Sequence, residues 1–287
     1  MARLHFGLLC IIFLNTWAGD EVSPAQAGQA RAPQGTTAEA RGAWVARQVD
    51  DRDTGRDARM AMRMRLVDRR GRVRERALTV LSLRGGPGRP VAGDRTLIRF
   101  TYPNDIEGTG FLVWEHPGAA DERFLYLPSL GRTRRIAASE AQESFIGSDF
   151  TYEDIGGREF DDYTYALLDE AAPETWTAAD GSTHPVYRLE SKPRDASARY
   201  PRVVSLVRRD NFVVVGAEIF NRRGGVQKTF EVSKLERVDG YWTTLEMKMT
   251  DRVQDTRTEL VFEDVAYDVG LSPDAFTRRE LERGRLP

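Results

Sequence analysis

The sequence predicts a mainly β protein of the α+β class. We expect a large curved antiparallel sheet that forms an unclosed half-barrel, with an N-terminal and a C-terminal helix acting as lid or plug against its concave face. Two observations lead to this prediction. Apolar and charged residues alternate with a period of two along about a dozen segments, as in half-buried strands. Short turns join these segments, and short connections require antiparallel pairing because parallel strands need long crossovers.

The first residues have the pattern of an export signal. Arg3 precedes an apolar run from Leu4 to Leu14, which is shorter than the ~20 residues that span a bilayer. We therefore expect a signal peptide at residues 1–19, with cleavage possible as late as the A-x-A triplet that ends at residue 27. The only cysteine, Cys10, lies within this run, so the mature chain has no thiol for a disulfide or a metal site. These features predict an exported, periplasmic protein.

A helix is expected after a flexible lead-in at residues 20–36, which is rich in Ala, Gln, Gly and Pro. Thr37 is the candidate N-cap of a helix over residues 38–49. The candidate lid residues of this helix are Trp44, Val45 and Val49, which lie at roughly helical intervals. The alternative is a helix that is simply packed on the sheet.

The strands follow one another without a linker, so we expect one domain over residues 37–287. Their predicted ranges are 58–68, 72–85, 95–102, 110–116, 123–128, 162–169, 186–191, 202–209, 212–220, 227–238, 242–253 and 258–268. Asp210-Asn211, Arg223-Gly224-Gly225 and Asp239-Gly240 are tight-turn signals between successive strands. Ser272 as N-cap and Pro273 at the first helical position predict a short closing helix.

Composition argues against several classes of function. The formal net charge of −2 gives no global case for nucleic-acid binding. His116 and His184 lie in no metal-binding spacing, and the chain contains no G-x-S-x-G, no P-loop and no dinucleotide-binding motif after a strand. We expect neither a metal, a cofactor nor an enzymatic activity.

The stretch FIGSDFTYED at residues 145–154 is the strongest candidate for chemistry. Asp149, Glu153 and Asp154 could act as paired carboxylates in hydrolysis, or could bind a cation. The favoured interpretation is structural. Gly147 and Ser148 form a turn, and the three acids form ion pairs with the nearby basic residues Arg132, Arg134 and Arg135.

Aromatic residues concentrate in the middle of the chain. The candidates for an apolar cleft are Phe100, Phe111, Trp114, Phe124, Tyr126, Phe145, Phe150 and Tyr152. Core packing explains many such residues. However, a strongly curved sheet with few helices has more concave apolar surface than its helices can cover, and an uncovered surface of that kind is a lipid-sized cleft.

Two central motifs carry a family resemblance. RFLYLPSLGRTRRI (123–136) followed by SFIGSDFTYEDI (144–155) resembles the hallmark pair of the outer membrane lipoprotein-sorting protein family, which is similar in fold to the carriers LolA and LolB. Shorter matching segments lie at residues 99–103, 108–114, 224–232, 242–251 and 274–283. The resemblance covers about residues 40–283.

The resemblance implies a half-barrel with a helical lid that holds the acyl chains of lipids or lipoproteins, without cofactor or catalysis. It also implies transient membrane contact and association with an inner-membrane export pump of the RND (resistance–nodulation–division) superfamily. The cargo-binding arginine and the membrane-inserting loop of the lipoprotein carriers have no recognisable counterpart in this sequence. Two alternatives remain: an accessory subunit of such a pump that carries no cargo, and a hydrolase that uses Asp149 and Glu153.

Overall fold

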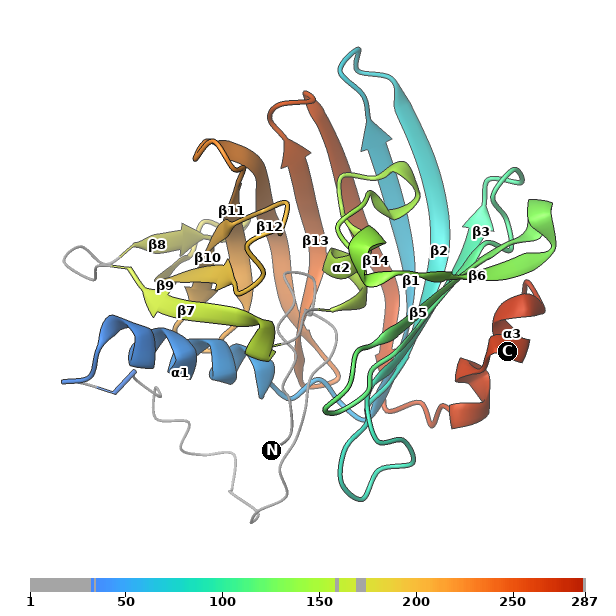
Figure 1. The fold of residues 1–287 in the computed structure, drawn as a ribbon, viewed down its shortest axis with the longest axis horizontal. Helices are drawn as coiled ribbons and strands as arrows, with labels where there is room; N and C mark the ends of the chain where they lie inside the picture. Colours follow the sequence, from blue (N-terminus) through green and yellow to red (C-terminus); the bar gives the residue numbers. More distant parts are fainter. Residues whose placement is uncertain (1–31, 34, 158–159, 169–173, 286–287) are drawn as a thin grey trace.

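The computed structural model describes residues 32–33, 35–157, 160–168 and 174–285 (Figure 1). The predicted signal peptide and most of the predicted lead-in lie outside the described residues. The α-helices are α1 (Ala38–Asp50), α2 (Tyr152–Gly156) and α3 (Arg278–Glu282). The strands are β1 (Asp57–Val67), β2 (Val73–Leu83), β3 (Arg95–Tyr102), β4 (Gly110–Trp114), β5 (Glu122–Leu127), β6 (Arg132–Ile136), β7 (Tyr163–Leu167), β8 (Thr175–Thr177), β9 (Thr183–Pro193), β10 (Arg202–Arg208), β11 (Val214–Phe220), β12 (Val226–Val238), β13 (Tyr241–Asp251) and β14 (Thr256–Tyr267).

The strands form one antiparallel sheet of 14 strands that does not close into a barrel. Their order is β6-β5-β4-β3-β2-β1-β14-β13-β12-β11-β10-β9-β7, and β8 pairs with β9 beside β7. Pairing of β1 with β14 therefore joins an N-terminal half to a C-terminal half. Figure 1 shows the sheet curving around α1 and α2. The predicted fold class, a large curved and unclosed antiparallel sheet, is confirmed.

The three turn signals predicted from the sequence lie in the connections from β10 to β11, from β11 to β12 and from β12 to β13. Asp239 and Gly240, with φ of 52° and 90°, connect β12 to β13. Both residues have the positive φ of a two-residue hairpin turn, which Asp and Gly tolerate better than other residues. Gly71, with φ of 74°, turns the chain between β1 and β2. These short links account for the antiparallel order.

Strand alternation divides the sheet into two faces. We call the face that bears Phe111 the inner face and the face that bears Leu112 the outer face, and cross-strand partners share a face. On β1, Met60, Met62 and Met64 point to the inner face, as the sequence pattern predicted, and each is at most 3% exposed. The main hydrophobic core lies on this face.

Helix α1 packs on the inner face at the edge formed by β7 and β9. Thr37 caps it, because its side-chain oxygen accepts a hydrogen bond from the Ala40 N–H at 3.2 Å. A Cβ at Gly42 would lie 2.5 Å from the Cα of Ala166 on β7, so glycine permits the close approach of helix and strand. The predicted helix and its cap are thus confirmed.

The C-terminal helix lies on the outer face, so its predicted place against the concave face is wrong. A 3-10 turn at Pro273–Phe276 and α3 cover a second apolar cluster on β2–β5. Leu81, Leu97 and Leu112 belong to this cluster, which makes these strands apolar on both faces. The outer face therefore also needs cover, and Ser272 caps the covering segment as expected.

A buried arginine lies beneath α3. Arg99 on β3 donates to the carbonyls of Gly108 at 2.7 Å and Glu280 at 2.9 Å. Burial lowers the pKa of Arg99 to about 10, while the Glu280 carboxylate acts in the opposite direction. This guanidinium fastens α3 to the sheet.

Three elements are absent from the sequence prediction: α2, β6 and β8. α2 has five residues and a capping box between Thr151 and Asp154, and β8 has three residues, so both are too short to show a periodic pattern. β6 is the segment RTRRI, whose charged residues point to both faces and hide the alternation. No helix among the described residues is long and apolar enough to cross a membrane.

Candidate functional site

The inner face is an apolar surface built in rows across the strands. In one row, Phe230 on β12 pairs with Met249 on β13 and Met249 with Thr258 on β14. A neighbouring row joins Val232, Met247 and Leu260 in the same way. The second row is apolar on both sides of the join between β13 and β14, whereas the first row ends on β14 at the hydroxyl of Thr258. All six side chains are at most 4% exposed, so this part of the inner face is covered in the structure.

The segment between β6 and β7 folds back over this face and inserts aromatic rings. Phe145 contacts Phe111 at a ring-centroid distance of 5.4 Å and Phe100 at 6.0 Å. Tyr152, at the start of α2, contacts Phe111 at 5.4 Å and Phe145 at 5.5 Å. Burial raises the pKa of Tyr152, and its hydrogen bond with Arg134 opposes that shift. We call residues 144–151 the inner loop.

The eight aromatic candidates for the cleft fall on the two faces of the sheet. The five in the inner-face core are Phe100, Phe111, Phe145, Phe150 and Tyr152. The other three, Trp114, Phe124 and Tyr126, pack against the C-terminal segment on the outer face. Trp114 and Phe124 contact each other at 5.1 Å, and the Trp114 indole N–H donates to the Phe276 carbonyl at 2.7 Å. The eight residues therefore form no common surface.

The candidate lid residues of α1 face the sheet. Val45 and Val49 belong to the inner-face core, and Trp44 packs edge-on against Phe212 at 5.6 Å. Phe212 in turn stacks on Tyr187 of β9. The helix is thus held by aromatic contacts at one end of the inner face.

The inner loop is fastened to β2 by Arg76, which the sequence analysis did not single out. Its Nη1 donates to the Ile146 carbonyl at 2.6 Å, and its guanidinium lies 5.8 Å from the Phe100 ring centroid. Burial lowers the pKa of Arg76. Ile146 has a φ of 48°, a strained conformation for a β-branched residue. The alternation of residues along the strand could have revealed it, because Arg76 shares a face with the apolar residues Leu78 and Val80.

Asp149 fastens the inner loop to β14. Its carboxylate accepts hydrogen bonds from the hydroxyls of Thr256 at 2.5 Å and Thr258 at 2.7 Å, and its N–H donates to Thr258 at 2.9 Å. The Lys228 ammonium donates to the Asp149 carbonyl at 2.5 Å. Gly147 (φ 73°) and Ser148 form the turn before it, as expected.

The other expected ion pairs give way to different partners. Glu153 accepts from the Tyr163 hydroxyl at 2.9 Å, and Asp154 forms the capping box of α2 with Thr151. The arginines contact other carboxylates, since Arg134 pairs with Glu140 at 2.8 Å and Arg135 with Glu122 at 3.4 Å. Arg132 is exposed on β6. Hydroxyls and backbone amides thus take the place of the three expected arginines as partners of these acids.

The carboxylates of this segment bind partners on different strands. Asp149 is bound over β14, whereas Glu153 is bound to Tyr163 of β7. The described residues contain no group of three or more His, Cys, Asp or Glu side chains that could hold a metal ion. The arrangement supports holding the loop in place and offers no observed acid–base pair.

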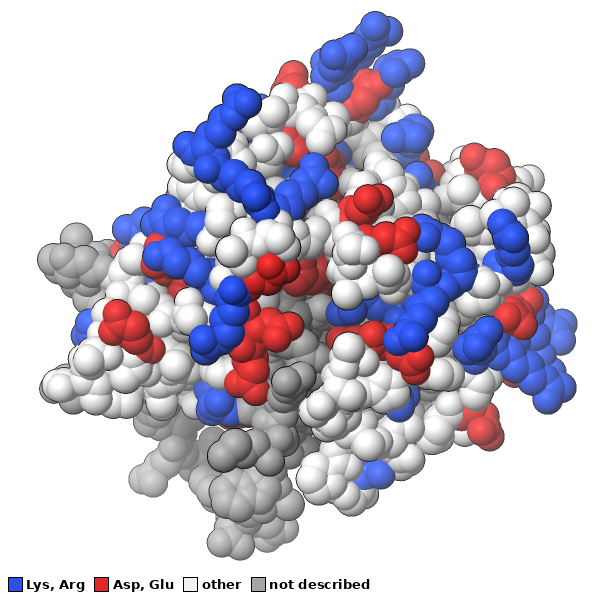
Figure 2. Space-filling model, viewed as in Figure 1, with Lys and Arg blue, Asp and Glu red and all other residues white. Residues whose placement is uncertain are grey.

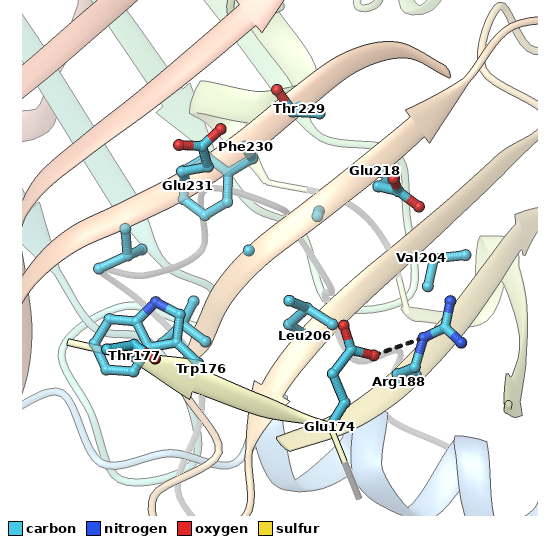
Figure 3. Close-up of a pocket in the computed structure, with 14 residues that line it drawn as sticks. Glu174, Trp176, Thr177, Arg188, Val204, Leu206, Glu218, Thr229, Phe230 and Glu231 are labelled. Atoms are coloured by element: carbon cyan, nitrogen blue, oxygen red, sulfur yellow. Dashed lines mark ion pairs between the residues drawn. The ribbon is translucent and has the colours of Figure 1, made fainter. Parts of the chain in front are cut away.

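A pocket of about 530 Å³ lies on the outer face, between β8 and the strands β10–β12 (Figure 3). Trp176 and Leu206 form its apolar part, and Glu218 and Glu231 lie on the opposite side. Glu174 and Arg188 form an ion pair of 2.9 Å at its edge. This pocket was not anticipated from the sequence, and the sheet separates it from the inner face.

Both signs of charge are interspersed on the face of the molecule drawn in Figure 2. This distribution agrees with the formal net charge of −2. It provides no extended field of one sign over that face.

Comparisons with known proteins give consistent matches. A family model described as "Uncharacterized protein" matches residues 92–283. No curated protein matches the chain. A DUF1329 family protein from Desulfovibrio piger is 30% identical with a TM-score of 0.76, and the match covers 86% of this chain and 100% of that chain.

Two further solved structures are similar. A putative outer membrane lipoprotein-sorting protein domain from Vibrio parahaemolyticus is 30% identical with a TM-score of 0.74, over 84% of this chain and 98% of that one. A LolA superfamily protein from Nitrosomonas europaea is 19% identical with a TM-score of 0.61, over 85% and 99% of the respective chains. The last likeness shows the fold alone, and it is a LolA-like fold.

Proposed function

Because this chain belongs to the family of the DUF1329 protein and the outer membrane lipoprotein-sorting protein domain, we propose that it is a periplasmic carrier of lipids or of the acyl chains of lipoproteins. The inner face supports the proposal most directly. It carries an apolar core that includes the row of Val232, Met247 and Leu260, with α1 and the inner loop placed over it. Binding on such a surface needs no covalent chemistry, and we expect neither cofactor nor catalysis.

The energetics of a carrier favour covered rather than open apolar surface. Burying an acyl chain contributes ~0.8 kcal/mol per CH₂, so a chain of ~14–16 carbons supplies on the order of 10 kcal/mol. Release is feasible only if the protein must open to admit the chain and this opening costs several kcal/mol. The net free energy of binding is then smaller by that amount. We infer that this cost comes from breaking two sets of contacts. Phe145 and Tyr152 separate from Phe111, and α1 separates from β7.

The decisive measurement is the composition of an organic extract. Protein purified from the envelope fraction of its natural host is expected to carry acyl chains that mass spectrometry detects. Carrier activity is then expected as transfer of a radiolabelled lipid from donor to acceptor vesicles. An empty extract together with no transfer between vesicles would contradict the proposal.

We further propose that the carrier exchanges its cargo with an inner-membrane RND-family pump, which the family resemblance implies. Co-purification of such a pump with cargo-loaded protein is the expected result. Co-purification with protein that never contains lipid would instead favour an accessory subunit without cargo.

The hydrolase alternative has its own outcome. Replacement of Asp149 or Glu153 by the isosteric amide retains the side-chain size at both positions. If either change abolished transfer while leaving the unfolding midpoint and lipid content unchanged, a catalytic role would be supported. We expect lipid transfer to persist in both variants.

A further inference from the structure

A polar pocket of about 310 Å³ lies at one end of the inner face, beneath the inner loop. Ser144 and residues 147–149 of the inner loop line one side of it. Asp251 of β13 and Thr256 of β14 lie on another side. The pocket is separate from the outer-face pocket of Figure 3, with which it shares no lining residue.

Strand register connects this pocket to the apolar surface. The row that contains Phe230, Met249 and Thr258 is followed, two residues along each strand, by Lys228, Asp251 and Thr256. Two residues of a strand span ~7 Å. Leu66, which pairs with Thr258, also lines the pocket. The apolar rows of the inner face thus end in one polar row.

Three cations converge on this pocket from separate elements. Lys228 comes from β12, Arg74 from β2 and Arg199 from the connection before β10. Lys228 is only 5% exposed, its Nζ lies 5.3 Å from the Tyr200 ring centroid, and the Asp149 carbonyl uses one of its three donors. A buried ammonium of this kind needs further acceptors.

None of these three cations has a carboxylate partner among the described residues. Arg199 contacts the side-chain and main-chain oxygens of Gln142, and its guanidinium lies 5.4 Å from the Tyr200 ring. Arg74 is exposed at the rim and makes no ion pair with any described residue. Each of the three cations therefore lies in the pocket without a direct ion pair to a described carboxylate.

The acidic residues of the pocket are occupied by other donors. Asp149 accepts from Thr256 and Thr258, and Asp251 accepts from the Gln227 amide at 2.9 Å and from the backbone N–H groups of residues 253 and 254. Asp68 pairs with Arg72 at 2.6 Å, and the fourth cation of the pocket, Arg257, pairs with Glu259 at 2.8 Å. The oxygens of Asp149 and Asp251 are thus occupied by neutral donors, and the three unpaired cations Arg74, Arg199 and Lys228 outnumber these two carboxylates by one.

We propose that this pocket binds a phosphate group, as the anionic head group of a lipid whose acyl chain lies along the inner face. The proposal rests on the proposed carrier function and adds a class of cargo to it. Lys228 and Arg199 make charge-assisted contacts with the phosphate oxygens, and Arg74 closes the rim. The side-chain amide of Gln254 supplies a neutral donor beside them.

The test compares two probes that carry the same single acyl chain. One is a lysophosphatidic acid with a phosphate head group, and the other is a monoacylglycerol without it. We expect the lysophosphatidic acid to bind the full-length mature protein at least about tenfold more tightly, as charge-assisted contacts permit. Titration calorimetry at low and at high salt measures the difference, which high salt reduces.

The variants assign that preference to the pocket. Lys228→Met is expected to reduce it to less than about threefold, and the rim variant Arg74→Gln to reduce it partly. Lys248→Met is the matched control, because Lys248 lies on the outer face and pairs with Glu231 at 2.9 Å. It removes the same charge without touching the pocket. If Lys228→Met fails to fold, Arg74→Gln with its exposed side chain carries the test.

Each other outcome overturns the proposal in a recognisable way. Equal binding of the two probes would contradict the head-group site without contradicting the carrier function. Inorganic phosphate that binds as tightly as lysophosphatidic acid, and loses affinity in Lys228→Met, identifies a free-anion site instead. Failure of both acyl probes to bind contradicts the carrier function itself, and the head-group site with it.

Discussion

Individual polar side chains on the inner face have a common role, which is to hold the inner loop. Arg76 binds the Ile146 carbonyl, Thr258 binds both the N–H and the carboxylate of Asp149, and Lys228 binds the Asp149 carbonyl. Each occupies a position where strand parity would otherwise place an apolar residue. Such positions can be recognised in a sequence as charged residues in the apolar phase of a strand.

Arg76→Met tests this role for β2. Methionine retains most of the length and packs beside Met64, so we expect the free energy of unfolding to change by only about 1 kcal/mol. The loop loses a hydrogen bond to a charged donor, worth ~1.5–3 kcal/mol. Residues 144–151 should therefore exchange their amide hydrogens faster, as measured by mass spectrometry. Arg63→Met on the outer face is the control, and unchanged loop exchange in Arg76→Met would show that Arg76 does not hold the loop.

Tyr241 gives the protein a predictable response to alkali. Burial and the hydrogen bond from its hydroxyl to Asp268 raise its pKa from the usual 10.0 to about 12. The unfolded chain therefore loses this proton first, and the Tyr241 contribution to stability falls as pH rises from 10.0 to about 12. Urea unfolding across this range measures the fall, which Tyr241→Phe should make shallower. An identical pH slope in the variant would contradict the assignment.

At the scale of elements, the two terminal segments cover opposite faces of one sheet. α1 lies on the inner face against β7, whereas α3 lies on the outer face against β4 and β5. Their interfaces also differ in kind. Gly42 brings α1 close to the backbone of β7, while Leu281 of α3 packs beside Gly110 of β4 as part of the outer cluster. Of the two terminal segments, only α1 is placed to uncover the proposed cargo surface.

Gly42→Ala separates close packing from helix propensity. Alanine favours an isolated helix by ~1 kcal/mol. Its Cβ would nevertheless lie 2.5 Å from the Ala166 backbone, which neither element can relieve without moving. We expect a net loss of about 1–3 kcal/mol in urea unfolding and a shift in Trp44 emission.

The control for this variant changes propensity alone. Ala40→Gly on the exposed side of α1 should cost about 1 kcal/mol and leave Trp44 emission unchanged. If Gly42→Ala stabilised the protein, α1 would not be held against β7 in the way the structure describes.

At the scale of the whole molecule, the sequence was informative about elements and poor about faces. Thr37 and Ser272 marked both end segments, and alternation marked β1 and the long strands, because these signals are local. The division of Phe111 and Phe124 between two faces depends on the register of β4 against β5, which local pattern does not determine. For the same reason the outer position of α3 was missed.

Pairing of β1 with β14 determines how the whole molecule should unfold. Ala58 pairs with Tyr267, so the two halves of the sheet are joined by strands from the two ends of the chain. We expect one cooperative transition, as for one domain. In single-tryptophan variants, Trp114 reports on the N-terminal half and Trp242 on the C-terminal half. Equal midpoints in urea are expected, and two separate midpoints would show two independent units.

A sheet that stays open leaves two edge strands with unpaired backbone groups, which invite strand addition from other copies. One edge, β7, has α1 packed along it. The other edge is β6, whose sequence Arg-Thr-Arg-Arg-Ile places positive charge directly on the exposed border. Two molecules that approached through this border would bring like charges together. The basic run at the end of the first family motif thereby disfavours edge-to-edge association.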